Sequence, residues 1–260
     1  MVRALDNPFV VFGIAIVAQC VAAYAGDFLR KKGKALSNDE QQDFDTVRTA
    51  TLTLLALIIG FSFSMAVSRY DQRKNYEEAE ANAIGTEYVR ADLLPVEDAA
   101  TVRELLMKYL DQRILFYEAR DEKRIGHINA ETAQLQGELW SAVARSAKAQ
   151  ATPVTWLAAS GMNDVLNSQG YTQAAWWNRI PAAAWVMMGL IAISCNVLIG
   201  YGERNGGALA LLVLPVVISI AMLLIADIDS PRGGVIHVLP ENLISLSQSM
   251  KRSSAHRIAF

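Results

Sequence analysis

Four long runs of apolar residues divide the chain, at residues 8–26, 50–68, 182–201 and 207–228. No run has a charged residue in its interior, and Asp227 lies at the end of the fourth. A helix of about 20 residues crosses a bilayer core of about 30 Å, so each run is long enough to span a membrane. Gly and Ala are frequent in the runs and Pro215 lies in the fourth, as membrane helices tolerate. The pattern predicts two hairpins of membrane helices, joined by residues 27–49 and by a tight turn at residues 202–206.

The first run also resembles a signal peptide. Ala23-Tyr24-Ala25 before Gly26 fits a small-x-small cleavage site. The segment before the run, however, offers Arg3 as its single base, and the apolar run is long for a signal sequence. We therefore expect a first span that is retained.

The polar block between the hairpins, residues 69–181, is predicted to be helical throughout. Its first helix should continue from the second span to Leu94 and stop at Pro95, because Pro cannot continue a helix. A second helix is expected from near Glu97, with apolar residues every three or four positions. No stretch alternates with a period of two, so the fold class is all-α. The periodic apolar positions of the second helix are Val102, Leu105, Leu106, Tyr109, Leu110 and Phe116.

Two further helices are expected in the block. Asn129 is a good N-cap for the third. Thr152-Pro153 supplies a cap and a first-turn proline for the fourth. The predicted domains are a transmembrane hairpin over 1–68, a helical domain over 69–181, a second hairpin over 182–228 and a polar C-terminal tail over 229–260.

Composition excludes several classes of function. Hydrophobic residues make up 52% of the 260 residues and the net charge is −2, so nucleic-acid binding has no support. No nucleophile motif, Gly-rich phosphate loop or carboxylate pair on a catalytic scaffold is present, and we expect no enzyme and no cofactor. The three histidines, His127, His237 and His256, lack metal-ligand spacing.

Membrane orientation does not follow from charge. Six Lys and Arg residues lie near span ends on the side of the termini and the helical block, and six lie on the side of the two loops. The positive-inside rule is therefore silent.

The second run has two different faces when its residues are placed about 100° apart around a helix. One face is small and polar with two bulky apolar residues. The opposite face carries Leu55, Ile58, Ile59 and Ala66. The polar face is either a helix-packing surface or the wall of a conduit, in which Leu57 and Phe61 from several subunits form a constriction that can dewet. We name it the polar stripe of the second run; its members are Thr49, Thr53, Leu57, Gly60, Ser64 and Ser68, with Phe61 at its edge.

Charged residues follow this run on the same helix. Arg69, Arg73, Lys74 and Glu77 come first, and in an oligomer they could form rings around an aqueous vestibule. The alternative is a helix face that simply meets solvent. Since both bases and acids are present, the sign of the preferred ion stays open.

Asp227 and Asp229 follow the fourth run and come before a turn with Pro231, Gly233 and Gly234. Two carboxylates with turn carbonyls form a weak candidate site for a hard cation, but no twelve-residue Ca²⁺ loop is present. The alternative is a helix end in which Asp227 pairs with an Arg at the membrane boundary.

Two stretches resemble a known family. GFSFSMAVSRYDQRKNYEEAEANAIGTEYVRADLLP, residues 60–95, resembles the signature of the bestrophin-like family of bacterial and plant membrane proteins. DIDSPRGGVIHVLPENL, residues 227–243, resembles the segment that follows the last span of that family. The order of spans and polar segments matches over the whole chain, and the family is remotely similar to the bestrophin anion channels.

The resemblance implies a pentameric ion channel of the bacterial inner membrane, conducting anions, with the termini and the helical domain in the cytoplasm. Gly60-Phe61 resembles the Gly-Phe of the bestrophin neck helix, which implies neck positions for Phe61, Leu57 and Thr53, flanked by Ser64. Thr53 and Leu57 depart from the bulky apolar and aromatic residues of that neck, which affects gating and selectivity. The acidic Ca²⁺ clasp of the animal channels is not reproduced.

The competing hypothesis is a non-conducting membrane scaffold or sensor whose helical domain binds a partner or a small ligand. A helical block framed by spans is common in sensors, although no output domain follows residue 230. Second spans around a central axis would favour the channel, and second spans buried in a monomer or dimer would favour the scaffold.

Overall fold

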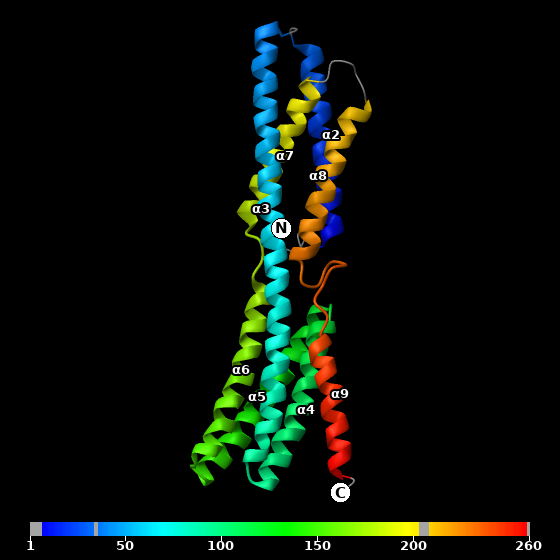
Figure 1. Ribbon diagram of the computed structural model, residues 1–260. Coiled ribbons are helices and arrows are strands. Elements are labelled where there is room, and N and C mark those ends of the chain that lie inside the picture. Colours follow the sequence, from blue (N-terminus) through cyan, green and yellow to red (C-terminus); the bar gives the residue numbers. More distant parts are fainter. Residues whose placement is uncertain (1–6, 34–35, 203–207, 259–260) are drawn as a thin grey trace. The chain divides into compact units, whose positions relative to one another are not determined.

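The computed structural model describes residues 7–33, 36–202 and 208–258, and this part of the chain is helical with no strand (Figure 1). The all-α prediction is confirmed. The chain forms two compact units, which we call the membrane unit (Met1–Tyr70 and Arg179–His237) and the soluble unit (Asp71–Asn178 and Val238–Phe260). The elements are α2 (Pro8–Lys32), α3 (Asn38–Arg90), the 3₁₀ helix η1 (Ala91–Leu93), α4 (Val96–Glu118), α5 (Glu122–Ala149), α6 (Pro153–Trp177), α7 (Ala182–Gly202), α8 (Ala208–Asp229) and α9 (Glu241–Ile258).

Within the part of the chain that the structure describes, four stretches of helix are long and apolar enough to cross a membrane, as predicted. They belong to α2, α3, α7 and α8, and they hold the described residues of the four apolar runs. Residues 203–206 of the predicted turn and residue 207 of the predicted fourth span lie outside the described residues. Pro215 lies inside α8 without ending it.

Close packing of α2 on α7 is possible because glycines lie at the contact. A Cβ atom at Gly26 would overlap the Val197 carbonyl, and one at Gly200 would overlap the Ala23 carbonyl. Small residues let membrane helices approach in this way. The segment that resembles a cleavage site is thus part of a helix, in which Ala23 packs on α7 and Tyr24 is exposed.

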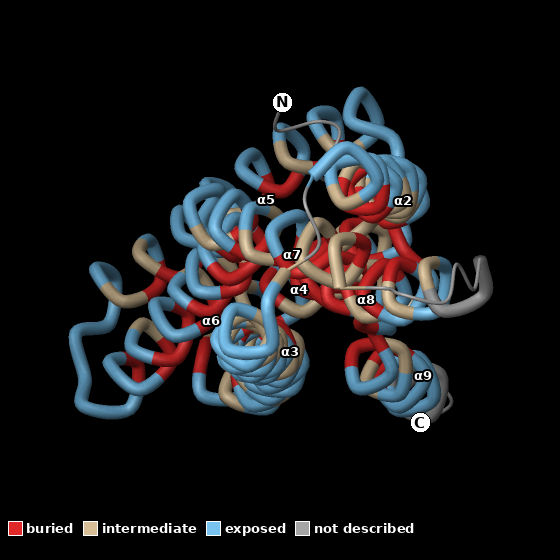
Figure 2. Tube along the Cα trace, turned by 90° about the horizontal axis from the view of Figure 1, so that it is seen from above, coloured by how far each residue is buried: buried red, intermediate tan, exposed pale blue. Residues whose placement is uncertain are grey.

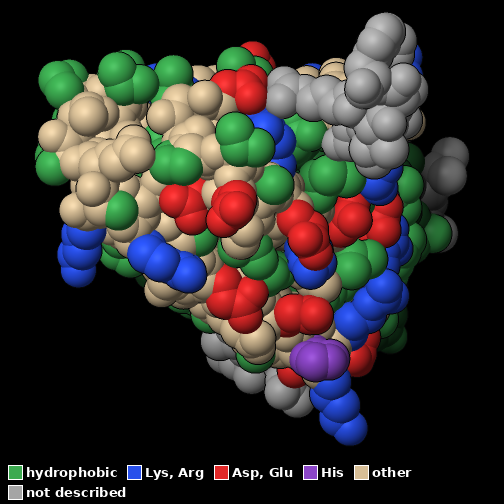
Figure 3. All heavy atoms as spheres, turned by 90° about the horizontal axis from the view of Figure 1, so that it is seen from below, with side chains coloured by type: hydrophobic (Ala, Val, Ile, Leu, Met, Phe, Trp, Pro, Cys, Tyr) green, Lys and Arg blue, Asp and Glu red, His purple; other side chains and the backbone are tan. Residues whose placement is uncertain are grey.

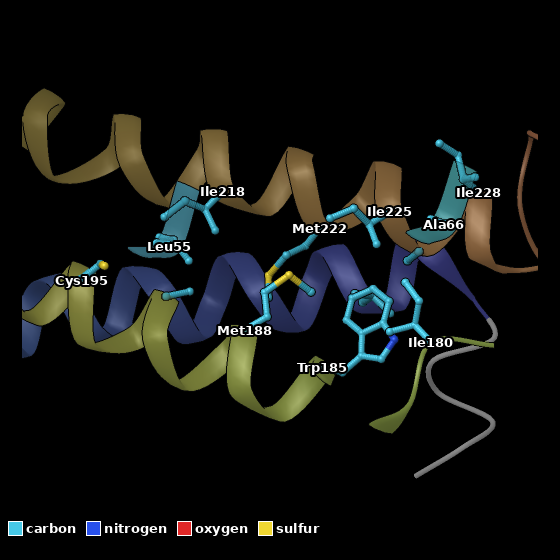
Figure 4. Close-up of a cluster of buried hydrophobic side chains, with 13 residues drawn as sticks. Leu55, Ala66, Ile180, Trp185, Met188, Cys195, Ile218, Met222, Ile225 and Ile228 are labelled. Atoms are coloured by element: carbon cyan, nitrogen blue, oxygen red, sulfur yellow. The ribbon is translucent and has the colours of Figure 1, made fainter. Parts of the chain in front are cut away.

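The core of the membrane unit lies where α3, α7 and α8 meet (Figure 4). Leu55 and Ala66 enter it from α3, and the side chains of Met188 and Met222 point toward one another between α7 and α8. Beside this core the Asn196 amide donates to Gln19 Oε1 (3.1 Å), and Gln19 donates to Ser219 Oγ (3.2 Å). These buried polar side chains link α2, α7 and α8 through hydrogen bonds, as polar groups in membrane helices do.

The soluble unit packs α4 on α5 and α9, and α5 on α6. The predicted apolar face of α4 is inside, with Val102, Leu106 and Tyr109 fully buried. Acidic and basic side chains are interspersed on the face seen from below in Figure 3. Such a mixed surface is typical of protein that meets water.

The helix boundaries agree with the sequence at two points and differ at two others. Pro95 separates η1 from α4, and Thr152 caps α6 through a capping box with Thr155, as predicted. The N-cap prediction at Asn129 is wrong, because α5 begins at Glu122 and Asp121 accepts from the Arg124 amide (3.0 Å). The predicted tail, residues 229–260, contains α9, which packs on α4 within the soluble unit.

Candidate functional site

The membrane half of α3 has one face inside the unit and one face outside it. Leu55 is 2% exposed and Ala66 is fully buried, whereas Leu57 is 51% and Phe61 is 59% exposed. The pale blue outer turns of α3 in Figure 2 show this uncovered face. Every residue of the polar stripe predicted from the sequence is exposed. These residues are Thr49, Thr53, Leu57, Gly60, Phe61, Ser64 and Ser68.

The opposite face of this half is used for packing. Ile58 and Ile59 are partly buried against the core that holds Leu55 and Ala66, and Ser62 is buried with them. The bulky apolar face is therefore the one that meets the rest of the unit. The polar stripe is left for another molecule, whether lipid, a second copy of the chain or water.

The threonine hydroxyls of the stripe donate to the backbone of their own helix. Thr53 Oγ1 donates to the Thr49 carbonyl (2.9 Å), and Thr49 Oγ1 donates to the Asp45 carbonyl (2.8 Å). One turn earlier, Thr46 Oγ1 donates to the Gln42 carbonyl (2.9 Å). Since a hydroxyl has one proton and two lone pairs, each of these groups presents an acceptor oxygen to its surroundings.

The first turns of α3 are polar, and a shallow open groove runs along them. Asp39 and Asp43 are exposed there, and the Arg48 guanidinium lies 3.0 Å from Asp45. The helix therefore begins with exposed carboxylates on its outer face and a base that is held by a neighbouring acid. The groove is lined by Asn38, Gln41, Gln42, Asp45, Thr46, Thr49 and Ala50.

The four vestibule candidates have different surroundings. Lys74 is exposed, and Arg69 is half-buried with Nη1 at 3.8 Å from Asp229. Arg73 is buried. Glu77 is 1% exposed, and its carboxylate accepts from the Asn242 amide side chain (2.6 Å) and the Leu243 backbone N–H (3.0 Å). Glu77 thus serves the first turn of α9, where orphan N–H groups and the helix dipole favour an anion.

Other residues of the soluble half of α3 occupy its exposed face. They are Asp71, Asn75, Glu78, Asn82 and Thr86. Asn75 follows Leu57 by about five helical turns, so these residues continue the polar stripe along the same uninterrupted helix. The sequence prediction does not include Asn75, Asn82 and Thr86, although extending the periodicity beyond Ser68 would have found them.

The inner face of the same half carries a buried ion pair. Glu80 and Arg113 are both fully buried and hydrogen-bonded to each other. Thr172 Oγ1 donates to the Glu80 carboxylate (3.1 Å), as does the Tyr117 hydroxyl (3.3 Å). Burial and the nearby Glu80 raise the pKa of Tyr117, so it remains a donor. The Glu80 charge is enclosed by protein and does not face a vestibule.

Glu87 is the second enclosed carboxyl of α3. It is fully buried against Gly161 of α6, and neither of its oxygens has a hydrogen-bond partner. Burial raises the pKa of Glu87 to about 8, with Arg90 opposing the shift and Asp164 adding to it. Arg90 and Asp164 themselves lie 3.9 Å apart. The carboxyl is thus poised to change charge near neutral pH.

The weak cation candidates Asp227 and Asp229 are both occupied by protein donors. Asp227 accepts from the backbone N–H groups of Val235 (2.7 Å) and Ile236 (3.1 Å). Asp229 accepts from the Ile180 N–H (3.1 Å). Arg69 and Arg179 lie within 4 Å of Asp229, so the boundary pairing expected for Asp227 belongs to Asp229 instead.

No metal cluster forms around these carboxylates in the described part of the chain, where no three His, Cys, Asp or Glu side chains gather. A side chain at Gly234 would overlap the Asp227 carboxylate, so the loop closes tightly over that group. The two aspartates therefore hold the loop after α8, and their oxygens are committed to backbone and guanidinium groups.

The chain matches the model of the bestrophin-like domain over residues 33–243. Among solved structures, it is similar to a bacterial bestrophin homologue from Klebsiella pneumoniae, with 16% identity, a TM-score of 0.62, and coverage of 93% of this chain and 95% of that one. Two single-residue variants of the Klebsiella pneumoniae homologue match with 15% identity and a TM-score of 0.63 (93% and 95% covered), and with 14% identity and a TM-score of 0.65 (94% and 94% covered). No curated protein matches the sequence.

The structural likeness establishes the fold, and the family model covers most of the chain, including the whole of α3 and the loop after α8. The resemblance drawn from residues 60–95 and 227–243 is confirmed: this chain is a member of the bestrophin-like family.

Proposed function

We propose that the protein is an oligomeric ion channel in which α3 lines the conduction path. The observation that carries the proposal is the polar stripe. This face of a membrane helix is uncovered in the single chain, and it combines hydroxyl groups with the bulky Leu57 and Phe61. A face directed only at lipid has no need of Thr and Ser hydroxyls, whereas a water-filled path does.

Several copies of the chain are needed to enclose such a path. A single α3 cannot surround water, and closed rotational symmetry is the usual arrangement of identical subunits. The family resemblance favours a pentamer with α3 nearest the axis, in the bacterial inner membrane and with the soluble unit in the cytoplasm. In that assembly the outward face of α3 would be the inner wall of the channel.

The neck of the proposed channel lies at Leu57 and Phe61. Rings of these two side chains form a narrow apolar stretch that can lose its water and so act as a gate. Thr53 and Ser64 flank the stretch with groups that hold water. Toward the soluble unit, Lys74 and Arg69 remain vestibule candidates, whereas the buried Arg73 and Glu77 do not fit that role.

Planar bilayer recordings on the purified protein test the proposal. We expect single-channel conductance in KCl, and we expect Leu57→Ala and Phe61→Ala to increase conductance or open probability, because they widen the neck. Leu190→Ala is the matched control, since Leu190 on α7 is 61% exposed and lies off the stripe. Conductance that is absent for several salts, in protein whose assembly is intact by size-exclusion chromatography, would refute the channel and favour the scaffold hypothesis.

A further inference from the structure

One carboxylate faces two guanidinium groups at one end of the membrane unit. Arg69 Nη1 lies 3.8 Å and Arg179 Nε lies 3.6 Å from the carboxylate of Asp229. The same carboxylate accepts from the Ile180 N–H, at 3.1 Å and 3.3 Å for its two oxygens. The two bases and the acid together carry one positive charge, so this group of side chains favours an added anion.

The guanidinium of Arg69 has a buried donor without a partner. Within the described part of the chain, no hydrogen-bond acceptor reaches its Nη1, and the atom is shielded from solvent. Its distance of 3.8 Å from Asp229 is too long for a hydrogen bond. A buried donor without an acceptor is unfavourable, so Arg69 favours a ligand that brings an oxygen atom to it. The side chain is 18% exposed, which leaves it accessible from outside.

The first turn of α7 adds a second attraction for an anion. Its first turn contains no acidic residue, and Ala182 and Ala183 are exposed. The first N–H groups of a helix have no partner within the helix and carry partial positive charge. The Ile180 N–H, two residues before α7, donates to Asp229 and so places this helix end beside the arginine pair.

These groups lie where the apolar runs end. Figure 4 shows Ile180 and Ile228 at one end of the core of the membrane unit. Arg179 and Asp229 are their immediate neighbours in the sequence, and Arg69 directly follows the second apolar run. The head groups of phospholipids flank the apolar core of a bilayer, and basic pockets between membrane helices bind them.

Exposed apolar side chains continue from this end into the membrane half. Val186 and Met187 are exposed one turn into α7, and Met65 is exposed on α3, one turn before Arg69. Acyl chains can lie along such side chains, whereas a free phosphate ion gains nothing from them. The position of the arginine pair therefore favours a lipid over a soluble anion.

We propose that Arg69 and Arg179 bind the phosphate group of an anionic phospholipid, with the first turn of α7 as a further donor. A planar guanidinium donates two parallel hydrogen bonds to a phosphate, which a single ammonium group does not. The inference goes beyond the proposed function and does not require conduction. It assigns Arg69 to a lipid site, which leaves Lys74 as the vestibule candidate.

The test is the thermal midpoint of the full-length protein in detergent, titrated with dioleoyl phosphatidylglycerol. We expect the midpoint to rise with the lipid, because a ligand of the folded protein stabilises it. The lipid concentration that gives half of this rise should be about tenfold higher in Arg69→Gln. Lys31→Gln is the matched control: it removes the same charge from an exposed position on α2 and should leave that concentration unchanged.

A second variant has the opposite expected effect. Asp229→Asn removes the competing negative charge and keeps an oxygen for the Ile180 N–H. It should lower the half-maximal lipid concentration by about two- to fivefold, because both guanidinium groups then face the phosphate alone. A purely structural role of the arginines predicts no such tightening, so this variant decides the question if Arg69→Gln fails to fold.

Three results would overturn the inference. A midpoint that phosphatidylglycerol leaves unchanged refutes the site. A rise of equal size with dioleoyl phosphatidylcholine, or a rise that Arg69→Gln and Asp229→Asn do not alter, refutes the role of the arginine pair. An equal rise with sodium phosphate at the same concentration refutes the lipid and assigns the pair to free phosphate.

Discussion

The two halves of α3 use opposite residue types for the same tasks. In the membrane half the packed face is mostly apolar, with Leu55 and Ala66 in the core, and the exposed face carries hydroxyls beside Leu57 and Phe61. In the soluble half the packed face holds four charged residues, and the exposed face carries amides and carboxylates. The buried charges are Arg73, Glu77, Glu80 and Glu87.

The difference shows that charge on a helix is no guide to exposure. A buried charge is costly unless it is paired or hydrogen-bonded. Glu77 meets this condition at the start of α9, and Glu80 meets it at Arg113. Neither oxygen of Glu87 has a hydrogen-bond partner. Its pKa of about 8 keeps the carboxyl protonated, and therefore uncharged, at neutral pH. Both halves bury apolar side chains, such as Leu55 in the membrane half and Ile84 in the soluble half, and the soluble half adds specific contacts of buried charged groups.

The largest effect is expected from breaking the buried ion pair. Glu80→Gln removes the charge that compensates Arg113 and leaves a buried guanidinium without a counterion. Loss of one partner of a buried pair costs about 3–5 kcal/mol. We expect the full-length protein in detergent to lose about 10 °C in thermal midpoint, measured by fluorescence-detected size exclusion after heating. Glu131→Gln, at an exposed position on α5, should change the midpoint by about 1 °C or less, and an unchanged midpoint in Glu80→Gln would contradict this account.

A matched pair of substitutions tests the two faces of the membrane half. Leu55→Ala leaves a cavity in the core of the membrane unit and should destabilise it by about 2–3 kcal/mol. Leu57→Ala, two residues away, removes an exposed side chain and should change stability by about 0.5 kcal/mol or less. The same thermal assay compares the two variants. Equal losses would show that the exposed stripe is covered within one chain, which would argue against a shared conduction path.

The effect of Glu87 should depend on pH. Its pKa is about 8 in the folded protein against an ordinary value of 4.5, so the folded chain keeps a proton that the unfolded chain releases between these values. The stabilisation is complete below about pH 4.5 and is lost as the pH rises through about 8. Glu87→Gln should match the parent protein near pH 5 and exceed its stability by about 1–3 kcal/mol above pH 8. Thermal midpoints at pH 5, 7 and 9 measure this, with Glu78→Gln as the control; a constant difference at all three values would contradict it.

Much of the membrane half is predictable because its signals are local. The lengths of the apolar runs define the spans, and helical periodicity alone separates Thr53, Leu57 and Ser64 from Leu55 and Ala66.

In the soluble unit, the helix cap at Thr152 is recognisable because a Ser or Thr side chain before Pro is a strong local pattern. At Asn129 the same kind of reasoning fails, since Asp121 provides a competing cap about two helical turns earlier in the chain.

The soluble half is harder to predict because its packed face contains charges. Arg73, Glu77, Glu80, Ile84 and Glu87 recur every three or four residues, which is the spacing of a buried face. A sequence interpretation that equates charge with exposure misses this spacing. It places Arg73 and Glu77 among the vestibule candidates. The residues that pair with these buried charges lie far away in the sequence, so no local sequence pattern identifies them. For the same reason the sequence predicts a polar tail where α9 lies. The distant partners include Arg113, Thr172 and Asn242.

The smallest expected effect concerns the contact between Glu77 and α9, and it tests whether this acid is structural. Glu77→Gln keeps an acceptor for the Leu243 N–H but removes the charge that favours the N-terminus of α9. The loss should be about 0.5–1 kcal/mol, confined to α9, and about two- to fivefold in its opening equilibrium. Trypsin cleavage at the exposed Lys251 and Arg252 reports on that opening, and we expect the Glu77→Gln protein to be cut faster by the same factor. Glu78→Gln, at the neighbouring exposed position, should leave cleavage unchanged. Faster cleavage of the Glu78→Gln protein with unchanged cleavage of the Glu77→Gln protein would reverse the inner and outer faces assigned to the soluble half of α3.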